Sequence, residues 1–200
     1  MNIRLATATI VIAMGTTQTV LAQDADEWIV RGGFHSMEPK SSAQQLVVDS
    51  TIGLTFAVTR MLAPKWGVEL FAALPFLHEI TLQGAGPVGE IGLLPPTLSA
   101  QYHFNPNRHV RPYIGAGLNY TVFSKERTYG AWQGMKLELD SSFGPAAQLG
   151  IDIDVIPGWF INLDARWFDI DTNAKLGGTN VGAIEIDPYA FGVTVGHRFQ

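Results

Sequence analysis

The chain has 200 residues, of which 46% are hydrophobic and only 16% are charged. Soluble domains carry about 25% charged residues, so this composition is unusually poor in charge. The formal net charge of −5 argues against a nucleic-acid partner, because nucleic acids are bound by basic surfaces. With no cysteine, the chain can form neither a disulfide framework nor a thiolate zinc site.

The first 22 residues are predicted to be a secretory signal peptide. A short basic start that ends at Arg4 precedes a mostly apolar stretch over residues 5–21, and residues 20–22 have the small-x-small form of a cleavage site. A transmembrane anchor is the alternative, but the polar residues 16–19 interrupt the apolar stretch well before about 20 residues. No other stretch approaches about 18 consecutive apolar residues, so residues 23–200 are expected to form one domain without a transmembrane helix.

The last strand-like segment, residues 187–199, shows the pattern that recurs along the chain. Alternate residues from Tyr189 to Phe199 are aromatic or aliphatic except for His197, while the opposite face carries small residues and Arg198. This period of two predicts a β-strand with one apolar face. Seven earlier segments alternate in the same way: residues 28–37, 51–61, 66–77, 97–104, 111–123, 143–154 and 159–170.

The connections alternate between short and long. Short turns with proline lie at residues 63–65, 105–107 and 156–158. Longer polar or glycine-rich stretches, expected to be loops, lie at residues 38–48, 78–94, 124–140 and 171–183. This alternation predicts an all-β, eight-stranded antiparallel up-and-down transmembrane β-barrel with long extracellular loops and short periplasmic turns.

Periodicity alone does not say which face of the barrel is inside. A soluble lipocalin is also an eight-stranded barrel, but its apolar face is turned inward. Three features favour the membrane: the terminal strand that ends near Phe199, aromatic residues near strand ends, and glycines on the polar face. A chain that ends in such a strand resembles outer-membrane barrels, in which the strand is read by the assembly machinery. That resemblance implies an assembly signal made of Phe191, Val193, Val195 and Phe199.

Several motifs, taken in order, resemble the OmpW family of small outer-membrane proteins. They are GVELFAALPF at 67–76, LPPTL at 94–98, RPYIGAGLNY at 111–120, DIDT at 169–172, KLGG at 175–178, and DPY and HRF within 187–199. The resemblance implies a narrow lumen that is open outside and blocked toward the periplasm. It also implies passive uptake of small hydrophobic molecules, which leave sideways through the barrel wall into the bilayer.

The resemblance places Phe71 where family members carry an apolar residue that narrows the lumen. It places Arg166 where the family pattern has an aromatic constriction residue, so this chain departs from a purely apolar plug. The expected lumen constriction and floor comprises the inward residues Glu69, Phe71, Gln148, Asp152, Asp164 and Arg166. Because a buried unpaired charge costs several kcal/mol, Arg166 is expected to pair with Glu69, Asp164 or another acid. This cluster either only fills and staples the barrel or also acts in transport.

Other chemistry finds little support in the sequence. No histidine has a serine two positions away on the same face, so the chain is not expected to be an enzyme. Acidic pairs at residues 152/154, 169/171 and 185/187 could hold Ca²⁺, but no complete calcium-loop pattern is present. We therefore expect no cofactor and no metal site.

The sequence thus predicts a monomeric protein of the bacterial outer membrane that passively admits small hydrophobic solutes. Its expected partners are outer-membrane lipid and lipopolysaccharide, the solutes, and the barrel assembly machinery. The alternative is a non-conducting structural or interaction barrel that acts through its extracellular loops, and the polar inward cluster keeps this alternative open.

Overall fold

The structure, a computed structural model, describes residues 25–40 and 46–199. The predicted signal peptide, residues 1–22, lies outside these residues. Within them, no helix is long and apolar enough to span a bilayer. The single helical element of the described residues is a short 3₁₀ turn, η1 (Gly130–Trp132).

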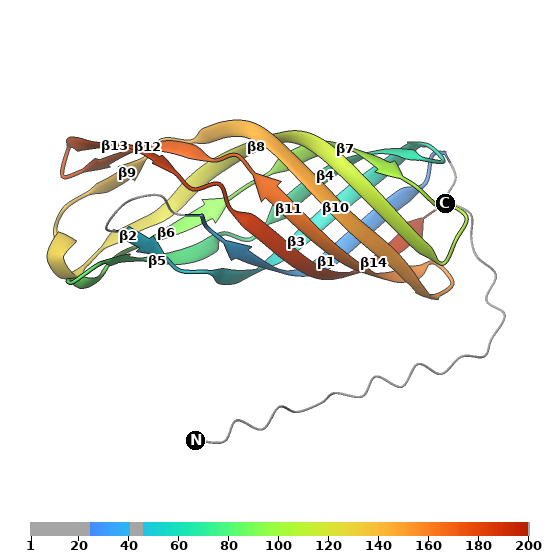
Figure 1. Ribbon diagram of the computed structural model, residues 1–200, viewed down its shortest axis with the longest axis horizontal. Coiled ribbons are helices and arrows are strands. Elements are labelled where there is room, and N and C mark those ends of the chain that lie inside the picture. The colour runs from blue at the N-terminus through green and yellow to red at the C-terminus, as the bar shows by residue number, and fades with distance from the viewer. Residues whose placement is uncertain (1–24, 41–45, 200) are drawn as a thin grey trace, which may run out of the picture.

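Eight antiparallel strands close into a barrel, as predicted (Figure 1). In order around the ring they are β1 (Trp28–Glu38), β3 (Thr51–Ala63), β4 (Trp66–Ala73), β7 (Thr97–His103), β8 (Val110–Thr128), β10 (Ser142–Ile156), β11 (Trp159–Phe168) and β14 (Tyr189–Phe199). The first and last strands pair over their whole length, from Trp28↔Phe199 to Glu38↔Tyr189. Closure satisfies the backbone groups that would otherwise face lipid, which offers no hydrogen-bond partner.

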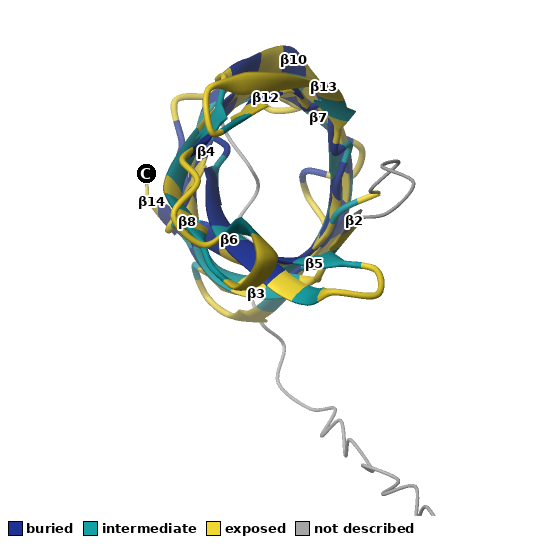
Figure 2. Cartoon of the chain, turned by 90° about the vertical axis from the view of Figure 1, so that its left-hand side faces the viewer, coloured by how far each residue is buried: buried dark blue, intermediate teal, exposed yellow. Residues whose placement is uncertain are grey.

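Side chains alternate between the two faces of the wall, and the apolar face is outside. Along β14, Tyr189, Phe191, Val193, Val195 and Phe199 are about half exposed, whereas Ala190 and Arg198 are buried inside. Buried and exposed residues therefore alternate along the strands of the barrel (Figure 2). Since a lipocalin has the opposite polarity, the exposed apolar face confirms the prediction of a membrane barrel.

The two rims of the barrel differ. At one end, the strands are joined by short turns: two residues, Pro64 and Lys65, between β3 and β4, and two, Pro157 and Gly158, between β10 and β11. Gly158 has φ +79°, a conformation that glycine adopts without strain. This short-turn rim faces the periplasm, and the opposite rim faces the exterior.

The exterior rim corrects the prediction of long loops. The stretches expected to be loops carry further strands that extend the barrel wall outward (Figure 1). They are β2 (Leu46–Val48), β5 (Phe76–Leu82), β6 (Gly86–Leu94), β9 (Leu137–Leu139), β12 (Asp171–Leu176) and β13 (Thr179–Glu185). These hairpins were not predicted as strands because they are rich in glycine and polar residues, which are depleted in ordinary strands.

The predicted third strand, residues 66–77, is also wrong in its second half. β4 ends at Ala73 and β5 begins at Phe76, so the strand is interrupted at Leu74 and Pro75. The break resets the alternation: Leu74 is 56% exposed, but Phe76, expected on the same face, is 1% exposed. Proline has no N–H to continue a ladder and restricts the residue before it, which explains the break.

The barrel interior divides into two zones. Toward the periplasm it is filled by buried charged and polar side chains such as Arg31, Glu69 and Asp152. Toward the exterior it is lined by a buried hydrophobic cluster, which we call the apolar collar: Met37, Ala57, Phe71, Ala73, Phe76, Ile80, Val88, Ile91, Leu93, Leu137, Ala146, Phe168, Ile170, Ile186 and Ala190. The residues predicted to form the constriction lie where these zones meet.

Candidate functional site

Glu69 on β4 is the centre of the polar zone. Its side chain is fully buried, and each carboxylate oxygen accepts hydrogen bonds from more than one strand. Oε1 accepts from Arg166 Nη1 at 2.8 Å and from Gln148 Nε2 at 3.1 Å. Oε2 accepts from Arg31 Nη1 at 3.3 Å and from Gln101 Nε2 at 2.8 Å. One carboxylate therefore links strands on opposite sides of the ring.

A second carboxylate, that of Asp164, completes the part of this network nearer the exterior. Asp164 Oδ2 accepts from Arg166 Nε at 2.6 Å, and Asp164 Oδ1 lies 3.1 Å from His35 Nε2. The other ring nitrogen of His35 is 2.7 Å from the hydroxyl of Thr55. The expectation that Arg166 pairs with an acid is thus met twice, by Glu69 and by Asp164.

The lower part of the network contains two further carboxylates. Asp152 Oδ2 accepts from Arg31 Nη2 at 3.0 Å, while its Oδ1 accepts from Asn162 at 2.8 Å. Asp154 accepts from Arg198 Nη1 at 2.8 Å and also from Arg111. These ion pairs link four arginines to four carboxylates, so the cluster they form is formally neutral. We call this cluster and its hydrogen-bonded neighbours the polar floor.

Phe71 separates the polar floor from the apolar collar. The guanidinium carbon of Arg166 lies 4.1 Å from the centroid of the Phe71 ring, a cation–π distance. The Phe71 ring also stacks with that of Phe168, with centroids 6.2 Å apart, and meets the His35 ring edge-on at 5.4 Å. The two phenylalanine rings therefore cover the side of the charged network that faces the exterior.

The structure gathers all six residues expected in the constriction. They are buried in the lumen: Glu69, Phe71, Gln148, Asp152, Asp164 and Arg166. Their role as a floor for transport stays a prediction. Arg31 and His35 also belong to this cluster. Their alternation with Val30 and Phe34 is typical of an inward face, but the sequence alone does not assign them to the cluster, because cross-strand partners depend on register. Tyr113 and Phe168 likewise alternate onto the inward face of their strands, and the sequence does not indicate their partners.

Little free space remains at the level of the floor. A pocket beside Gln148 and Arg166 holds about 10 Å³, the size of one water molecule. A second recess, between Arg31, His35 and Phe71, has no space for a water molecule. Neither recess therefore offers a wide aqueous path through the floor, as expected for an eight-stranded barrel filled by side chains.

The wall beside the apolar collar is interrupted. Pairing of β4 with β7 ends at Phe71↔Thr97, and pairing of β5 with β6 begins at Phe76↔Leu93. Between these pairs, among the described strands, no register joins residues 72–75 to residues 94–96. Pro75, Pro95 and Pro96 lie in this stretch and have no N–H to donate. We call it the unpaired window.

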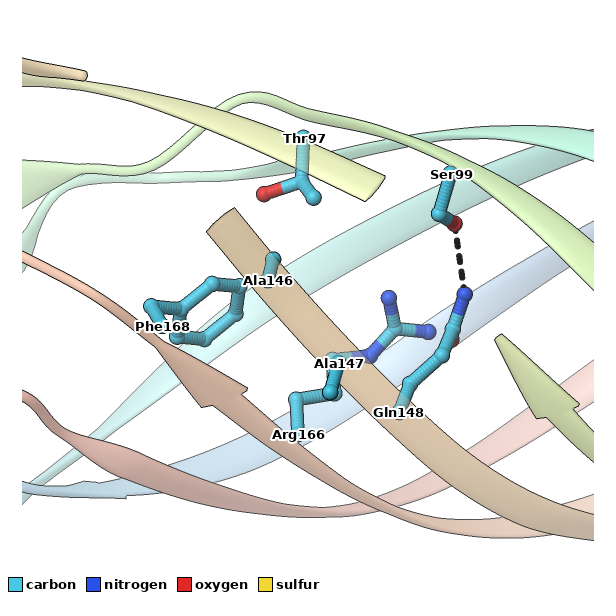
Figure 3. A pocket seen from close by; sticks show the side chains of 7 residues that line it. All are labelled: Thr97, Ser99, Ala146, Ala147, Gln148, Arg166 and Phe168. Carbon is cyan, nitrogen blue, oxygen red and sulfur yellow. Dashed lines mark hydrogen bonds between the residues drawn. The ribbon is translucent and has the colours of Figure 1, made fainter. Parts of the chain in front are cut away.

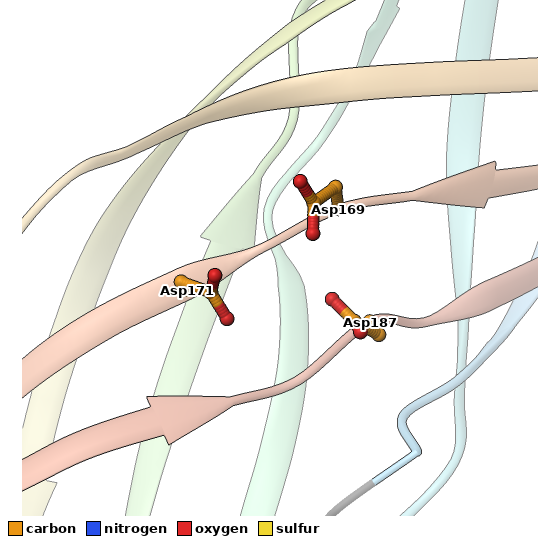
Figure 4. A group of neighbouring side chains, drawn as sticks. All are labelled: Asp169, Asp171 and Asp187. Carbon is orange, nitrogen blue, oxygen red and sulfur yellow. The ribbon is translucent and has the colours of Figure 1, made fainter.

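Three aspartates gather at the exterior end of β11 and β14 (Figure 4). Oxygen atoms of Asp169, Asp171 and Asp187 lie within 4.8 Å of one another. The sequence pairs 169/171 and 185/187 had not indicated that Asp187 joins the first pair. Partial burial, together with the charges of Asp187 and Asp171, raises the pKa of Asp169 above its usual value.

We expect Asp169→Asn to raise the urea midpoint of unfolding slightly at pH 7. A raised pKa in the folded state means that ionised Asp169 weakens the fold, so removing the charge helps wherever the carboxylate is ionised. The gain should vanish below about pH 4, where the carboxyl group is protonated in both states. Asp140→Asn, at an exposed aspartate on the same rim, is the control; a gain that persists at pH 3 would contradict this explanation.

The predicted assembly residues lie on the outer face of β14. Phe191, Val193, Val195 and Phe199 are each at least 50% exposed, which places them against lipid. Arg198, on the opposite face of the same strand, is buried and pairs with Asp154, so its charge is kept out of lipid. Recognition of this strand during assembly stays a prediction.

Comparison with known proteins agrees with this architecture. The model of the OmpW family matches residues 8–199. The chain is 34% identical to outer membrane protein W of Escherichia coli K12 over 98% of this chain and 99% of the relative. It is 31% identical, over 73% of this chain and 71% of the relative, to the dibenzothiophene metabolism operon protein PahQ of Pseudomonas aeruginosa.

Solved structures give the same result. The crystal structure of the outer membrane protein OprG from Pseudomonas aeruginosa superposes with a TM-score of 0.79 at 33% identity. The match covers 90% of this chain and 98% of OprG. The matched family model and these full-length likenesses establish the assignment: the chain belongs to the OmpW family of outer-membrane β-barrel proteins.

Proposed function

We propose that this barrel passively admits small hydrophobic molecules from the exterior and releases them sideways into the bilayer. The observation that carries the proposal is the apolar collar, a continuous hydrophobic lining that ends on a charged floor. A hydrophobic solute gains free energy by leaving water for such a lining, at about 25 cal/mol for each Å² buried. The polar floor opposes its further passage toward the periplasm.

The unpaired window is the exit in this proposal. Collar residues Phe71, Ala73, Phe76 and Leu93 line its inner side, and Leu74 lies on the lipid-facing side with 56% of its surface exposed. Where neighbouring strands share no ladder, separating them breaks no cross-strand hydrogen bond. A solute held in the collar therefore has a low-cost route to lipid at this level.

The name of one relative agrees with an apolar solute. PahQ is named for a dibenzothiophene metabolism operon, and dibenzothiophene is an uncharged aromatic compound. No energy source is required, because movement from the exterior into lipid runs down a concentration gradient. We assign the protein to transport rather than to catalysis, with lipid, lipopolysaccharide and the solute as its partners, acting as a monomer that the assembly machinery inserts through β14.

A second candidate is a non-conducting barrel that binds a partner through its exterior strands. The observation in its favour is the dense packing of the polar floor, which holds about 10 Å³ of free space at most in the recesses described. Dense packing blocks passage through the floor, but it does not block a path that turns aside above it.

The test is uptake of a fluorescent hydrophobic probe, N-phenyl-1-naphthylamine, by cells that lack their own barrel of this type. Cells with this protein should take up the probe faster than cells with an unrelated eight-stranded barrel at the same surface level. Equal rates with a correctly assembled barrel would reject the conduit and favour the interaction barrel.

A further inference from the structure

A small pocket lies at the boundary between the collar and the floor. Its inward-facing lining residues are Thr97, Ser99, Ala146, Gln148, Arg166 and Phe168 (Figure 3). It sits over Gly117 of β8, which pairs with Ser99 on one side and Ala146 on the other. A Cβ atom at residue 117 would lie 2.1 Å from the carbonyl oxygen of Leu98, so no larger residue fits there. Two of the lining residues, Ala146 and Phe168, also belong to the collar.

Gln148, one of the residues that line this pocket, carries an unused acceptor. Its Nε2 donates to Glu69 Oε1 at 3.1 Å and to Ser99 Oγ at 2.6 Å. A carboxylate only accepts, so the amide nitrogen must face Glu69 and the amide oxygen must point elsewhere. That oxygen is buried and, within the described residues, has no hydrogen-bond partner. An unsatisfied buried acceptor costs free energy, so it favours a ligand that donates to it.

Arg166 presents an unused donor next to it. Its Nε and Nη1 are occupied by Asp164 and Glu69, and Phe71 covers one face of the guanidinium. The described residues provide no hydrogen bond to the remaining nitrogen, Nη2. Arg166 and Gln148 both donate to Glu69 Oε1, and Figure 3 shows their side chains beside each other at the pocket.

The volume of the pocket and the charges beside it limit which chemical groups can bind there. The pocket holds about 10 Å³, enough for one oxygen atom with its hydrogen. The charge of Arg166 is already balanced by Glu69 and Asp164, so an added carboxylate gains no free counter-charge. A hydroxyl group fits better, because it is neutral, accepts from Arg166 and donates to Gln148.

We infer that this pocket is a binding subsite for the terminal hydroxyl group of a neutral amphipathic solute whose apolar chain lies in the collar. The inference rests on the proposed function and specifies its substrate class: alcohols bind in preference to alkanes of the same length. Gln148 and Arg166 are specificity-determining residues, since both contact the hydroxyl group. The alcohol reaches the subsite past Phe168 and Ala146.

The experiment compares 1-octanol with n-octane by NMR on the protein in lipid nanodiscs. Glutamine carries ¹⁵N in its side chain, and isoleucine carries ¹³C in its δ-methyl groups. Both compounds should shift the collar methyl groups of Ile91 and Ile170, but only 1-octanol should shift the carboxamide of Gln148. When both affinities are expressed relative to concentration in the lipid phase, 1-octanol should bind about tenfold more tightly than n-octane, because each net hydrogen bond contributes about a factor of two to ten in affinity.

The possible outcomes distinguish failure of the proposed hydroxyl subsite from failure of the proposed transport function. If both compounds shift Ile91 and Ile170 equally while Gln148 is unchanged, the subsite is rejected and the conduit stands. If neither compound shifts a collar methyl group, the proposed function fails, and the subsite fails with it.

A pair of variants adds an independent check. Ala146→Val fills the pocket without touching an ion pair and should remove the advantage of 1-octanol while octane still binds. Ala116→Val, on the lipid-facing side of the neighbouring strand, should leave the advantage intact. An advantage that survives in Ala146→Val would overturn the assignment.

Discussion

Replacement of Glu69 by alanine is expected to lower the free energy of unfolding by about 3–5 kcal/mol, the range for removing one partner of a buried ion pair. The loss leaves Arg31 and Arg166 each with one fewer carboxylate and removes an acceptor from Gln101 and Gln148. Unfolding in urea, followed by tryptophan fluorescence in lipid vesicles, measures the change.

The control for this prediction is Glu138→Ala. Glu138 pairs with Lys136 on the exterior rim, where the Lys136 side chain is 77% exposed and that of Glu138 42% exposed, so its loss should change the unfolding midpoint little. A Glu69→Ala barrel that unfolds within about 1 kcal/mol of the wild type would show that the network contributes little, as some buried ion pairs do.

The second large effect concerns uptake. Ala73→Trp should reduce uptake of N-phenyl-1-naphthylamine to the rate of cells that lack the protein. Ala73 is a buried collar residue where β4 ends, so an indole ring there fills the inner side of the unpaired window. The measurement is the initial rate of fluorescence increase at matched amounts of folded barrel.

Ala72→Trp is the matched control, because Ala72 is the preceding residue and faces outward. It adds the same ring on the lipid side and should leave the uptake rate near that of the wild type. Equal inhibition by both variants would indicate a general loss of assembly rather than a blocked exit.

Residue alternation predicted the barrel wall well, because lipid outside and a packed lumen inside impose opposite preferences on neighbouring residues. Val193 and Thr194, for example, follow the pattern: the first is exposed to lipid and the second is buried. The alternation did not predict the strands that lie beyond the bilayer. Outside it, the pressure for alternation relaxes, so hairpins such as β12–β13 were taken for loops.

The floor could be predicted in part. Polar residues on inward faces had to be buried, and that condition identified Glu69, Asp164 and Arg166 as a group. Which acid pairs with which arginine depends on strand register, and register brings Arg31 to both Glu69 and Asp152. The unpaired window could not be predicted either, since the alternation was extended across Pro75.

Photochemical labelling with a diazirine derivative of a short alkane tests the central claim most directly. The probe is added to cells that carry the barrel, light is applied, and the modified residues are identified by mass spectrometry. The collar should be labelled at inward residues such as Ile91, Leu93 and Ile186, and excess n-octane should suppress this labelling. Labelling confined to lipid-facing residues such as Leu98 and Phe143 would contradict the account, because it would show that hydrophobic molecules do not occupy the lumen.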